Sequence, residues 1–492
     1  MQVKIKISDW DAGIPVIMLK SKTAGRLGIH PKQRLLLRTL SKKPKQIYAI
    51  VDIFEKFLKE NEVAVSLEVK KVLGIKEGSK IDISIAPIPA SLEYIKEKLN
   101  NRRLSEEKIK LIIQDIVDNK LSESEISLFV SAMYNPGMTF DETVSLIEAI
   151  LSSGTTLSFR KRYVVDKHCI GGIPGNRTTP IVVAICASQG LTMPKSSSRA
   201  ITSAAGTADV IETLTRVDLN MEEVKKVVNK TNACLVWGGG LGMVPADSKI
   251  IAIEKELKID PEAQLLASIM AKKLAVGSKY ILIDVPYGPF AKVSKKKGKA
   301  LKFKFEKLGR HFGVDLKVVL TKGDSPIGNG VGPVLEMQDV LAVLDPKKQG
   351  PKDLEKKSLF LAGEIFEMTK MCRKGKGIFL AKHLLDSGQA YEKFKEIIRA
   401  QGGKLKKLEL AKDSYDFIAQ HTLKIKHLNN KKINSLARVL GCPLDKTTGI
   451  YLHKKVGEKV KKGEKILTLY AESKPRLGEA IRFLEKEKPV KF

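Results

Sequence analysis

The sequence predicts an α/β protein built from a small N-terminal β-barrel-like domain, a helical domain, a large mixed α/β domain and a C-terminal α+β region. Three observations lead to this prediction. The chain has 492 residues, more than one hydrophobic core usually serves. Strand-like and helical apolar patterns alternate through the middle of the chain, as in partly parallel sheets. Short strands separated by turns lie near both ends.

Composition indicates a globular protein that stays in the cytoplasm. Hydrophobic residues make up 43% of the chain and charged residues 29%, which is typical of soluble domains. The longest apolar runs, such as 181–186, fall far short of the ~20 residues that cross a bilayer. No signal peptide follows Met1. We therefore expect no membrane association.

The strongly basic balance first suggests nucleic-acid binding. Lys and Arg number 87 against 55 Asp and Glu, a formal net charge of +32, and phosphate neutralisation drives such binding. The lysines are dispersed, however, and no basic motif interleaved with aromatic residues is present. The densest run, Lys295 to Lys304, is expected to be a flexible surface loop. We expect attraction of small anionic substrates instead, and no nucleic-acid partner.

Residues 1–88 contain a weak internal repeat. Residues 72–84 repeat the pattern of residues 26–38, and each segment is predicted to form a helical turn, a corner and a strand. Two such halves predict a pseudo-symmetric small β barrel that resembles double-psi or swapped-hairpin barrels. An accessory or oligomerisation module fits this prediction.

A helical domain follows at 89–161. The sequence Pro87-Ile-Pro89 breaks the strand pattern, and Ser105 and Thr139 stand where helix N-caps are expected. Gly154 follows the last helix as a stop. Apolar residues spaced for one buried helical stripe follow Ser105, namely Ile109, Ile112, Ile113, Ile116 and Val117.

The central α/β domain is predicted at 162–344 and the C-terminal α+β region at 345–492. Strand-like runs in the central domain are expected at 181–187, 233–237, 280–285 and 318–320. The C-terminal region begins helical. Its later part, 449–469, carries paired Val-Gly and Lys-Gly corners that predict a compact β hairpin unit similar to lipoyl-like or hammerhead modules.

Two small-residue loops have the composition of phosphate sites. The segment 196–214 combines hydroxyls, Gly206 and a helix expected from about Thr207, whose N-terminus favours an anion. The segment 166–179 offers the Lys167 ammonium, threonine hydroxyls and Gly171-Gly172. Each loop alone is also compatible with an ordinary surface turn, but together they favour phosphate.

No metal or cofactor is expected. The five cysteines form no CxxC pair, which predicts reduced thiols rather than disulfides or a zinc ribbon. The histidines have no spacing of the HExxH type.

The two loops, in this order, resemble those of the family of thymidine phosphorylases, pyrimidine nucleoside phosphorylases and archaeal-type AMP phosphorylases. The family signature runs Lys-His-(small)-x-Gly-Gly, matched at 167–172, and then Ser-x-Arg with Gly-Thr, matched at 197–207. Further segments follow the family order from residue 92 to the C-terminus, among them 245–247, 267–273, 284–288 and 332–336.

The resemblance implies a helical domain, completed by about 245–275, that faces the α/β domain across a cleft. It places Lys167, Ser197 and Thr207 at phosphate-binding positions. Ser268 and Lys272 match positions that contact the base in the pyrimidine enzymes. A phosphate-contacting serine of the family is Cys169 here, and a thiol is a weaker donor, so its contribution is open.

Within the family, the chain resembles the AMP phosphorylases more closely. The Arg with which pyrimidine enzymes read the base is absent from the helix after Pro245, and the N-terminal extension is present. The AMP phosphorylase pattern implies Asp260 as the general acid that protonates the leaving base. It also implies a set of nucleotide-contacting positions, namely Gly172, Ser198, Arg199, Ala200, Ile201, Thr202, Ser203, Thr207, Ser268 and Lys292.

The functional hypothesis is phosphorolysis of nucleoside 5′-monophosphates, with AMP and phosphate giving adenine and ribose 1,5-bisphosphate in nucleotide catabolism. The alternatives are a pyrimidine nucleoside phosphorylase and a phosphoribosyltransferase of related fold. The sequence leaves the preference among AMP, CMP and UMP open. The family implies a homodimer, and the N-terminal barrel suggests a larger homo-oligomer.

Overall fold

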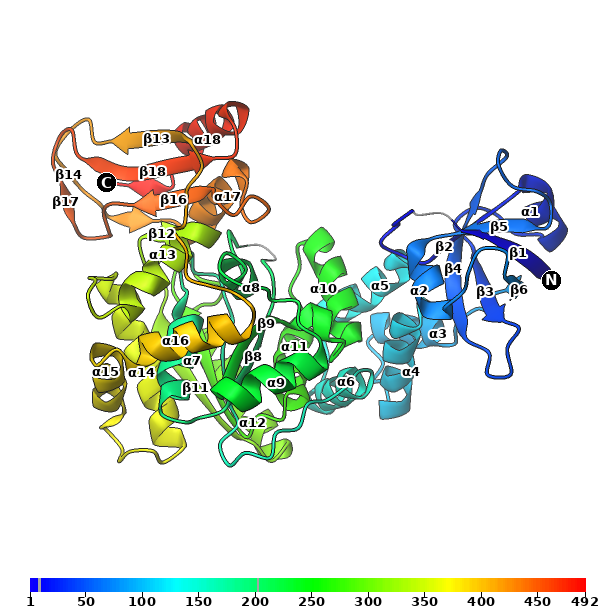
Figure 1. Ribbon diagram of the computed structural model, residues 1–492, viewed down its shortest axis with the longest axis horizontal. Helices are drawn as coiled ribbons and strands as arrows, with labels where there is room; N and C mark the ends of the chain where they lie inside the picture. The colour runs from blue at the N-terminus through cyan, green and yellow to red at the C-terminus, as the bar shows by residue number, and fades with distance from the viewer. Residues whose placement is uncertain (8–9, 201–202) are drawn as a thin grey trace. The chain divides into compact units, whose positions relative to one another are not determined.

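The computed structural model describes residues 1–492 except 8–9 and 201–202. The chain divides into two compact units (Figure 1). One consists of Met1–Gly154 with Pro245–Ser268, and the other of Thr155–Val244 with Ile269–Phe492. The predicted α/β class is confirmed, with a closed barrel at the N-terminus. Among the described helices, none is long and apolar enough to cross a membrane.

Six strands close the N-terminal barrel in the order β1-β5-β2-β4-β3-β6. The β1–β5 and β2–β4 pairs are parallel and the others antiparallel. Exchanging β1 with β4, β2 with β5 and β3 with β6 reproduces every pairing, so the predicted internal repeat is confirmed. The strands are β1 (Gln2–Ile7), β2 (Val16–Leu19), β3 (Arg34–Thr39), β4 (Gln46–Ile53), β5 (Glu62–Val65) and β6 (Lys80–Ile85).

Each half of the barrel carries one short helix, α1 (Ser21–Leu27) or α2 (Leu67–Leu73), before its last strand. Both helices end at a glycine in the left-handed region, Gly28 with φ 60° and Gly74 with φ 64°. Glycine adopts this conformation without a steric penalty. These two residues form the corner that the repeat predicted.

The same unit contains a bundle of helices whose caps follow the predicted positions. Ser105 accepts from the Lys108 N–H, and Thr139 forms a reciprocal capping box with Glu142. Glu142 also accepts two bonds from the buried Lys98 ammonium, at 2.8 and 3.0 Å. The helices are α3 (Ser91–Leu99), α4 (Glu106–Val117), α5 (Glu123–Tyr134), α6 (Phe140–Ser152) and α10 (Pro245–Leu257).

Five parallel strands form the centre of the second unit. They run β9-β8-β7-β10-β11, with the isolated bridge between Val164 and Thr192 joining β8 to β7. The chain adds β8 and β9 on one side of β7, then β10 and β11 on the other. The strands are β7 (Val165–Cys169), β8 (Met193–Ser197), β9 (Ala233–Trp237), β10 (Tyr280–Tyr287) and β11 (Asp315–Lys322).

One large apolar core of this unit includes Ile185, Leu282 and Phe366. In the described part of the chain, ten helices follow or separate the strands. They are α7 (Thr178–Ser188), α8 (Thr207–Ile211), α9 (Met221–Thr231), η1 (Gly238–Leu241), α11 (Glu262–Ala275), α12 (Lys295–His311), α13 (Pro333–Leu344), α14 (Lys352–Met368), α15 (Gly377–Asp386) and α16 (Gln389–Ala400). Helix α11 runs across the boundary between the two units at Ser268.

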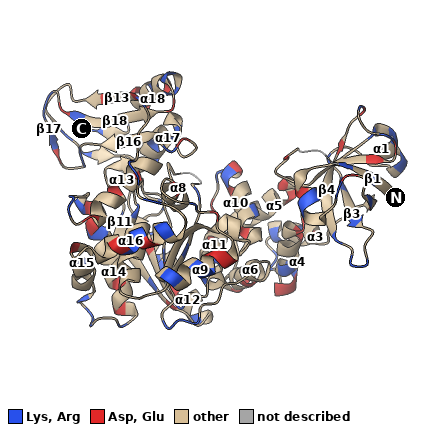
Figure 2. Ribbon diagram, in the orientation of Figure 1, with Lys and Arg blue, Asp and Glu red and all other residues tan. Residues whose placement is uncertain are grey.

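Two sequence predictions in this unit are wrong. Residues 181–187, predicted as a strand, lie in α7, whose middle turns are buried on all sides and therefore show no helical periodicity. The lysine run 295–304, predicted as a flexible loop, lies in α12. Ser294 caps α12 and Leu301, Phe305 and Leu308 form its buried stripe. Lys and Arg are spread over all parts of the chain (Figure 2).

The C-terminal part of the second unit has its own core, which includes Ile433, Leu467 and Leu469. A four-stranded sheet runs β12-β16-β18-β13, so that Gly330–Val331 of the central domain forms its edge. Its elements are β12 (Gly330–Val331), β13 (Asp413–Ile418), β14 (Leu423–Lys424), β15 (His427–Leu428), α17 (Asn430–Leu440), β16 (Gly449–Leu452), β17 (Lys459–Val460), β18 (Lys465–Ala471), α18 (Lys474–Glu487) and β19 (Val490–Lys491).

Candidate active site

The two predicted phosphate loops leave the sheet at the same edge. β7 ends at Cys169 and β8 at Ser197, and each loop leads to the N-terminus of a helix, α7 or α8. Strand order reverses between β7 and β10, and in open α/β sheets ligands bind beyond the carboxyl ends of strands at such a point. The fold therefore assigns the candidate site to this edge.

Lys167 of β7 is fully buried at this edge. Its Nζ donates to the hydroxyls of Thr178, at 2.7 Å, and Thr179, at 3.3 Å, both in the first turn of α7. Burial lowers the pKa of Lys167 to about 8. Because an ammonium only donates, each threonine hydroxyl keeps its own hydrogen for another acceptor.

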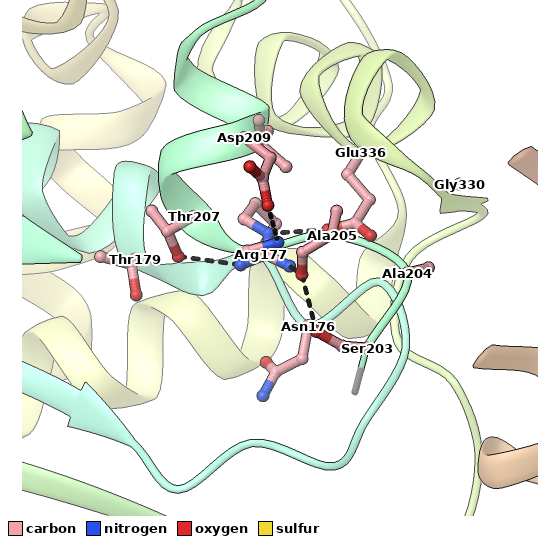
Figure 3. A network of polar contacts seen from close by, with 12 residues as sticks. Asn176, Arg177, Thr179, Ser203, Ala204, Ala205, Thr207, Asp209, Gly330 and Glu336 are labelled. Carbon is pink, nitrogen blue, oxygen red and sulfur yellow. Dashed lines mark hydrogen bonds and ion pairs between the residues drawn. The ribbon is translucent and has the colours of Figure 1, made fainter. Parts of the chain in front are cut away.

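Arg177 acts in the same way on the second loop (Figure 3). Its Nη1 donates to the Thr207 hydroxyl at 2.8 Å, its Nη2 to the Ala205 carbonyl at 2.9 Å and its Nε to Glu336 at 2.7 Å. Thr207 thus also keeps its hydroxyl hydrogen for a further acceptor. Three threonine hydroxyls of the two loops are oriented as donors by cations, which suits an anion.

Ser196 and Ser197 add two further hydroxyls. Among the described residues neither Oγ has a hydrogen-bond partner, although both atoms are buried. A buried hydroxyl without a partner is costly. A ligand that accepts hydrogen bonds would satisfy them at the end of β8.

Cys169 is a poor member of this donor set. Its sulfur receives the N–H of Gly171 at 3.5 Å and the Asn176 amide at 3.3 Å. Burial raises the pKa of the Cys169 thiol, so it stays neutral.

Buried charges behind the loops favour an anion. Asp166 pairs with Lys195 at 3.0 Å and with Lys273 at 2.8 Å, and Asp284 pairs with Lys357 at 2.9 Å. With Lys167 included, the buried lysines outnumber these carboxylates by two when all are ionised. Burial and the neighbouring lysines hold the pKa of His168 well below its usual value, so its imidazole is neutral.

Described residues on both sides of 201–202 bond to Asp209. The Asp209 Oδ2 accepts the N–H of Ala200 at 2.7 Å and of Gly206 at 2.8 Å. Ser203 donates to the Ala205 carbonyl at 3.1 Å, and Ser198 is exposed. The predicted positions Ile201 and Thr202 lie outside the described residues.

Arg199 is held by acidic partners rather than standing open for a substrate. It makes two bonds to Glu212, at 2.6 and 2.7 Å, and its guanidinium lies over the Trp237 ring. The bond from Arg199, together with Lys446, lowers the pKa of Glu212 to about 2. In this arrangement Arg199 fixes the loop.

The C-terminal region contacts both this loop and the end of α8. The Ala204 N–H donates to the Asn434 side chain of α17 at 3.1 Å, and the Lys446 ammonium lies 2.6 Å from Glu212. Described residues of the segment between β8 and α8 are thus bonded to two side chains distant in the sequence, Arg177 and Asn434.

Gly172 and Lys292 lie together. Gly172 has φ +91°, and a Cβ at this position would lie 3.1 Å from both the Cβ and the backbone N of Lys292. Only glycine allows the two segments to approach so closely. The Lys292 side chain is exposed.

The remaining predicted residues belong to α11 and the segment before it. Asp260 is exposed, Ser268 is buried, and Lys272 lies one helical turn after Ser268 and is half-buried. Asp260 and Ser268 belong to the first compact unit and Lys272 to the second.

The sequence prediction missed Arg177, Asp209, Glu336 and Asn434 as residues that shape the site. Arg177 carried the clearest signal, because it follows Gly175-Asn176 directly before the α7 threonines. Nothing in the sequence links it to Glu336, 159 residues later.

Known proteins match the chain along its whole length. An AMP phosphorylase of Pyrococcus furiosus is 42% identical, over 100% of this chain and 98% of that protein. AMP phosphorylase 1 of Archaeoglobus fulgidus is 38% identical, over 96% and 94%. The chain belongs to the AMP phosphorylase family.

Domain comparisons agree with this membership. Residues 92–154 match the glycosyl transferase family helical bundle domain, 161–391 its a/b domain and 424–491 the pyrimidine nucleoside phosphorylase C-terminal domain. Among solved structures, the anthranilate phosphoribosyltransferase of Thermus thermophilus superposes with a TM-score of 0.52 at 17% identity. The match covers 63% of this chain and 99% of that one, and it shows the shared fold. Among the described residues, no group of His, Cys, Asp and Glu could hold a metal ion.

Proposed function

We propose that the chain is a pentosyltransferase that cleaves AMP with inorganic phosphate, giving adenine and ribose 1,5-bisphosphate. The observation that carries the proposal is the set of donor hydroxyls of Thr178, Thr179 and Thr207, oriented by Lys167 and Arg177 at the carboxyl edge of the sheet. Membership in the AMP phosphorylase family supports the choice of substrate.

In the proposed reaction, phosphate binds to Lys167, Ser197 and Thr207 and attacks C1′ of the ribose with inversion. The donors hold the attacking dianion, and the lysines behind them offset its charge. The C1′–N bond breaks as the C1′–O bond forms, and its electron pair goes to the base. Asp260 is proposed to donate the proton that makes adenine a competent leaving group.

The nucleotide carries a second dianion, its 5′-phosphate. We assign this group to the loop 198–203 with Thr207, Gly172 and Lys292. Ser268 and Lys272 of α11 are assigned to the ribose and base side. Arg199 serves this loop by holding it through Glu212 rather than by direct contact.

The cellular setting is also proposed. The reaction belongs to nucleotide catabolism in the cytoplasm, and the enzyme acts as a homodimer or larger homo-oligomer. CMP and UMP are further candidate substrates, because they carry the same ribose 5′-phosphate and the same C1′–N bond to a base. The reaction as proposed uses no metal or cofactor.

A substrate panel tests the proposal. Purified protein is incubated with phosphate and AMP, CMP, UMP, adenosine, thymidine or uridine, and free base is measured by chromatography. We expect base release from AMP that depends on phosphate and persists in EDTA. Release from thymidine or uridine but not from AMP would show a pyrimidine nucleoside phosphorylase instead.

A further inference from the structure

A second buried carboxylate, Asp284 of β10, lies near the phosphate lysine. Asp284 pairs in register with Cys169 and is fully buried. Its Oδ1 accepts from the Thr321 hydroxyl at 2.6 Å, and its Oδ2 lies 2.9 Å from the Lys357 ammonium. Lys357 comes from α14, outside both phosphate loops. The carboxylate is thus held on both oxygens by side chains of β11 and α14, which lie outside the two phosphate loops in the sequence.

Lys167, in contrast, has no carboxylate within ion-pair distance among the described residues and bonds only to the hydroxyls of Thr178 and Thr179. Lys167 pairs in register with Leu282, two residues before Asp284 on β10, so the side chains of Lys167 and Asp284 lie on the same face of the sheet. Burial lowers the pKa of Lys167, and Asp284 is one of the groups that oppose this shift. Burial raises the pKa of Asp284, and Lys357 and then Lys167 overcome this and lower it. Asp284 is therefore a competitor for the Lys167 ammonium.

We propose that Lys357 is a positioning residue for phosphate. Because Lys357 pairs with Asp284, the Lys167 ammonium stays available to the incoming anion. The inference rests on the proposed function, because it takes Lys167 as a phosphate ligand. The Asp284–Lys357 pair has no net charge, so it neither repels phosphate nor draws Lys167 away. An unpaired Asp284 would do both.

The first test variant is Lys357→Met, which keeps the apolar stem and removes the charge. It leaves Asp284 buried without its partner, so Lys167 turns toward the carboxylate. Phosphate then loses a charge-assisted bond, and we expect its Kd to rise about 10- to 100-fold. The affinity for AMP should change little, so the effect appears in the KM for phosphate rather than in that for AMP.

The decisive variant is the double substitution Lys357→Met with Asp284→Asn. It removes the competitor together with its partner, so phosphate affinity should return to within about threefold of wild type. Lys357→Arg, which keeps the charge, should also retain affinity. A merely structural pair predicts the opposite: lower thermal stability in the variants, with phosphate affinity unchanged in Lys357→Met.

The pH dependence provides a further readout. The groups that act on Lys167 are Cys169, Asp284, Lys357 and Lys195. Removing Lys357 removes a repelling charge and frees Asp284 to pair, so both changes favour the charged lysine. The pH at which phosphate affinity begins to fall should move upward in Lys357→Met and return in the double variant.

The experiment is calorimetric titration of the full chain with inorganic phosphate, without AMP, from about pH 7 to about pH 9.5. Weak binding by Lys357→Met and recovery in the double variant are the expected results. Unchanged binding by Lys357→Met, or a double variant no better than the single one, would overturn the inference. Because AMP is absent, a chain that binds phosphate but does not cleave AMP would overturn only the proposed function.

Discussion

Replacing Arg177 by Met should change the stability of the protein, the pH dependence of that stability and the KM for phosphate. Arg177 joins three segments through its bonds to Glu336, Thr207 and the Ala205 carbonyl (Figure 3). The side chains of Arg177 and Glu336 are 11% and 1% exposed. Removing one partner of a buried ion pair costs about 3–5 kcal/mol. The variant should therefore unfold at a lower temperature.

The stability loss should depend on pH. Burial already raises the pKa of Glu336, and Arg177 opposes this shift. Without Arg177 the folded-state pKa rises further above the unfolded value. At low pH the Glu336 carboxyl is protonated in both the folded and the unfolded variant, so the variant keeps its stability there. That stability is lost as pH rises through the folded-state pKa of Glu336. Thermal unfolding of Arg177→Met should approach that of wild type as pH falls from about 8 to about 5.

The functional loss should be separable from the stability loss. Thr207 loses the donor that orients its hydroxyl, which weakens one bond to an anion. Such a bond contributes about 1.5–3 kcal/mol, so the KM for phosphate should rise roughly 10- to 150-fold. Adding Glu336→Gln should restore part of the stability but not the KM. Arg177→Lys cannot reach three acceptors in three directions, so its KM should also rise.

The assay is initial-rate kinetics with varied phosphate, together with thermal unfolding of the same preparations. A raised KM in Arg177→Met and in the double variant is the expected result. A KM equal to wild type, with only the unfolding temperature lowered, would refute the role of Arg177 in orienting Thr207.

Three further predictions follow from the site. Asp260→Asn should abolish AMP cleavage while AMP binding remains measurable by calorimetry, and near-normal turnover would remove Asp260 from the mechanism. Burial lowers the pKa of Lys167 to about 8, so its charge is lost as pH rises through that value. The KM for phosphate should then increase about tenfold per pH unit above it, and a KM that stays flat to about pH 9.5 would argue against Lys167 as a ligand. Gly172→Ala should raise the KM for AMP by displacing Lys292. Gly171→Ala, with a similar φ of +87° but no atom within 4 Å of the added Cβ, is the matched control and should raise it much less.

Local patterns in the sequence were enough to predict much of the fold. The barrel repeat predicted both corners, since Gly28 and Gly74 each follow an identical Leu and precede an identical Ile. The caps at Ser105 and Thr139 predicted two helix starts because capping depends on residues three apart. Strands 233–237 and 280–285 were predicted from short apolar runs and lie in β9 and β10.

The errors have equally local causes. Helix α7 is apolar on every side, so residues 181–187 carried no period with which to tell a helix from a buried strand. In α12 the buried stripe has only three large apolar residues, Leu301, Phe305 and Leu308, and the many lysines made its helical spacing hard to recognise. The dense lysines predicted a flexible surface loop, whereas they lie on the solvated face of a helix.

The candidate site could be predicted only in part. The residues proposed to bind the ligand stand in short sequence motifs, whereas the residues that orient them lie far away in the sequence. Lys167 and Thr207 stand in recognisable motifs. Their environment depends on Asp284, Glu336 and Asn434, which tertiary folding brings to the same edge of the sheet. No motif shows that Arg199 and Lys446 both pair with Glu212.

The most direct test of the central claim is ³¹P NMR of the reaction of AMP with inorganic phosphate in the presence of the purified chain. We expect the AMP and phosphate signals to decline together and the two signals of α-ribose 1,5-bisphosphate to appear in step with free adenine. Adenine formed without consumption of phosphate, or AMP left intact while the protein binds phosphate, would contradict this expectation.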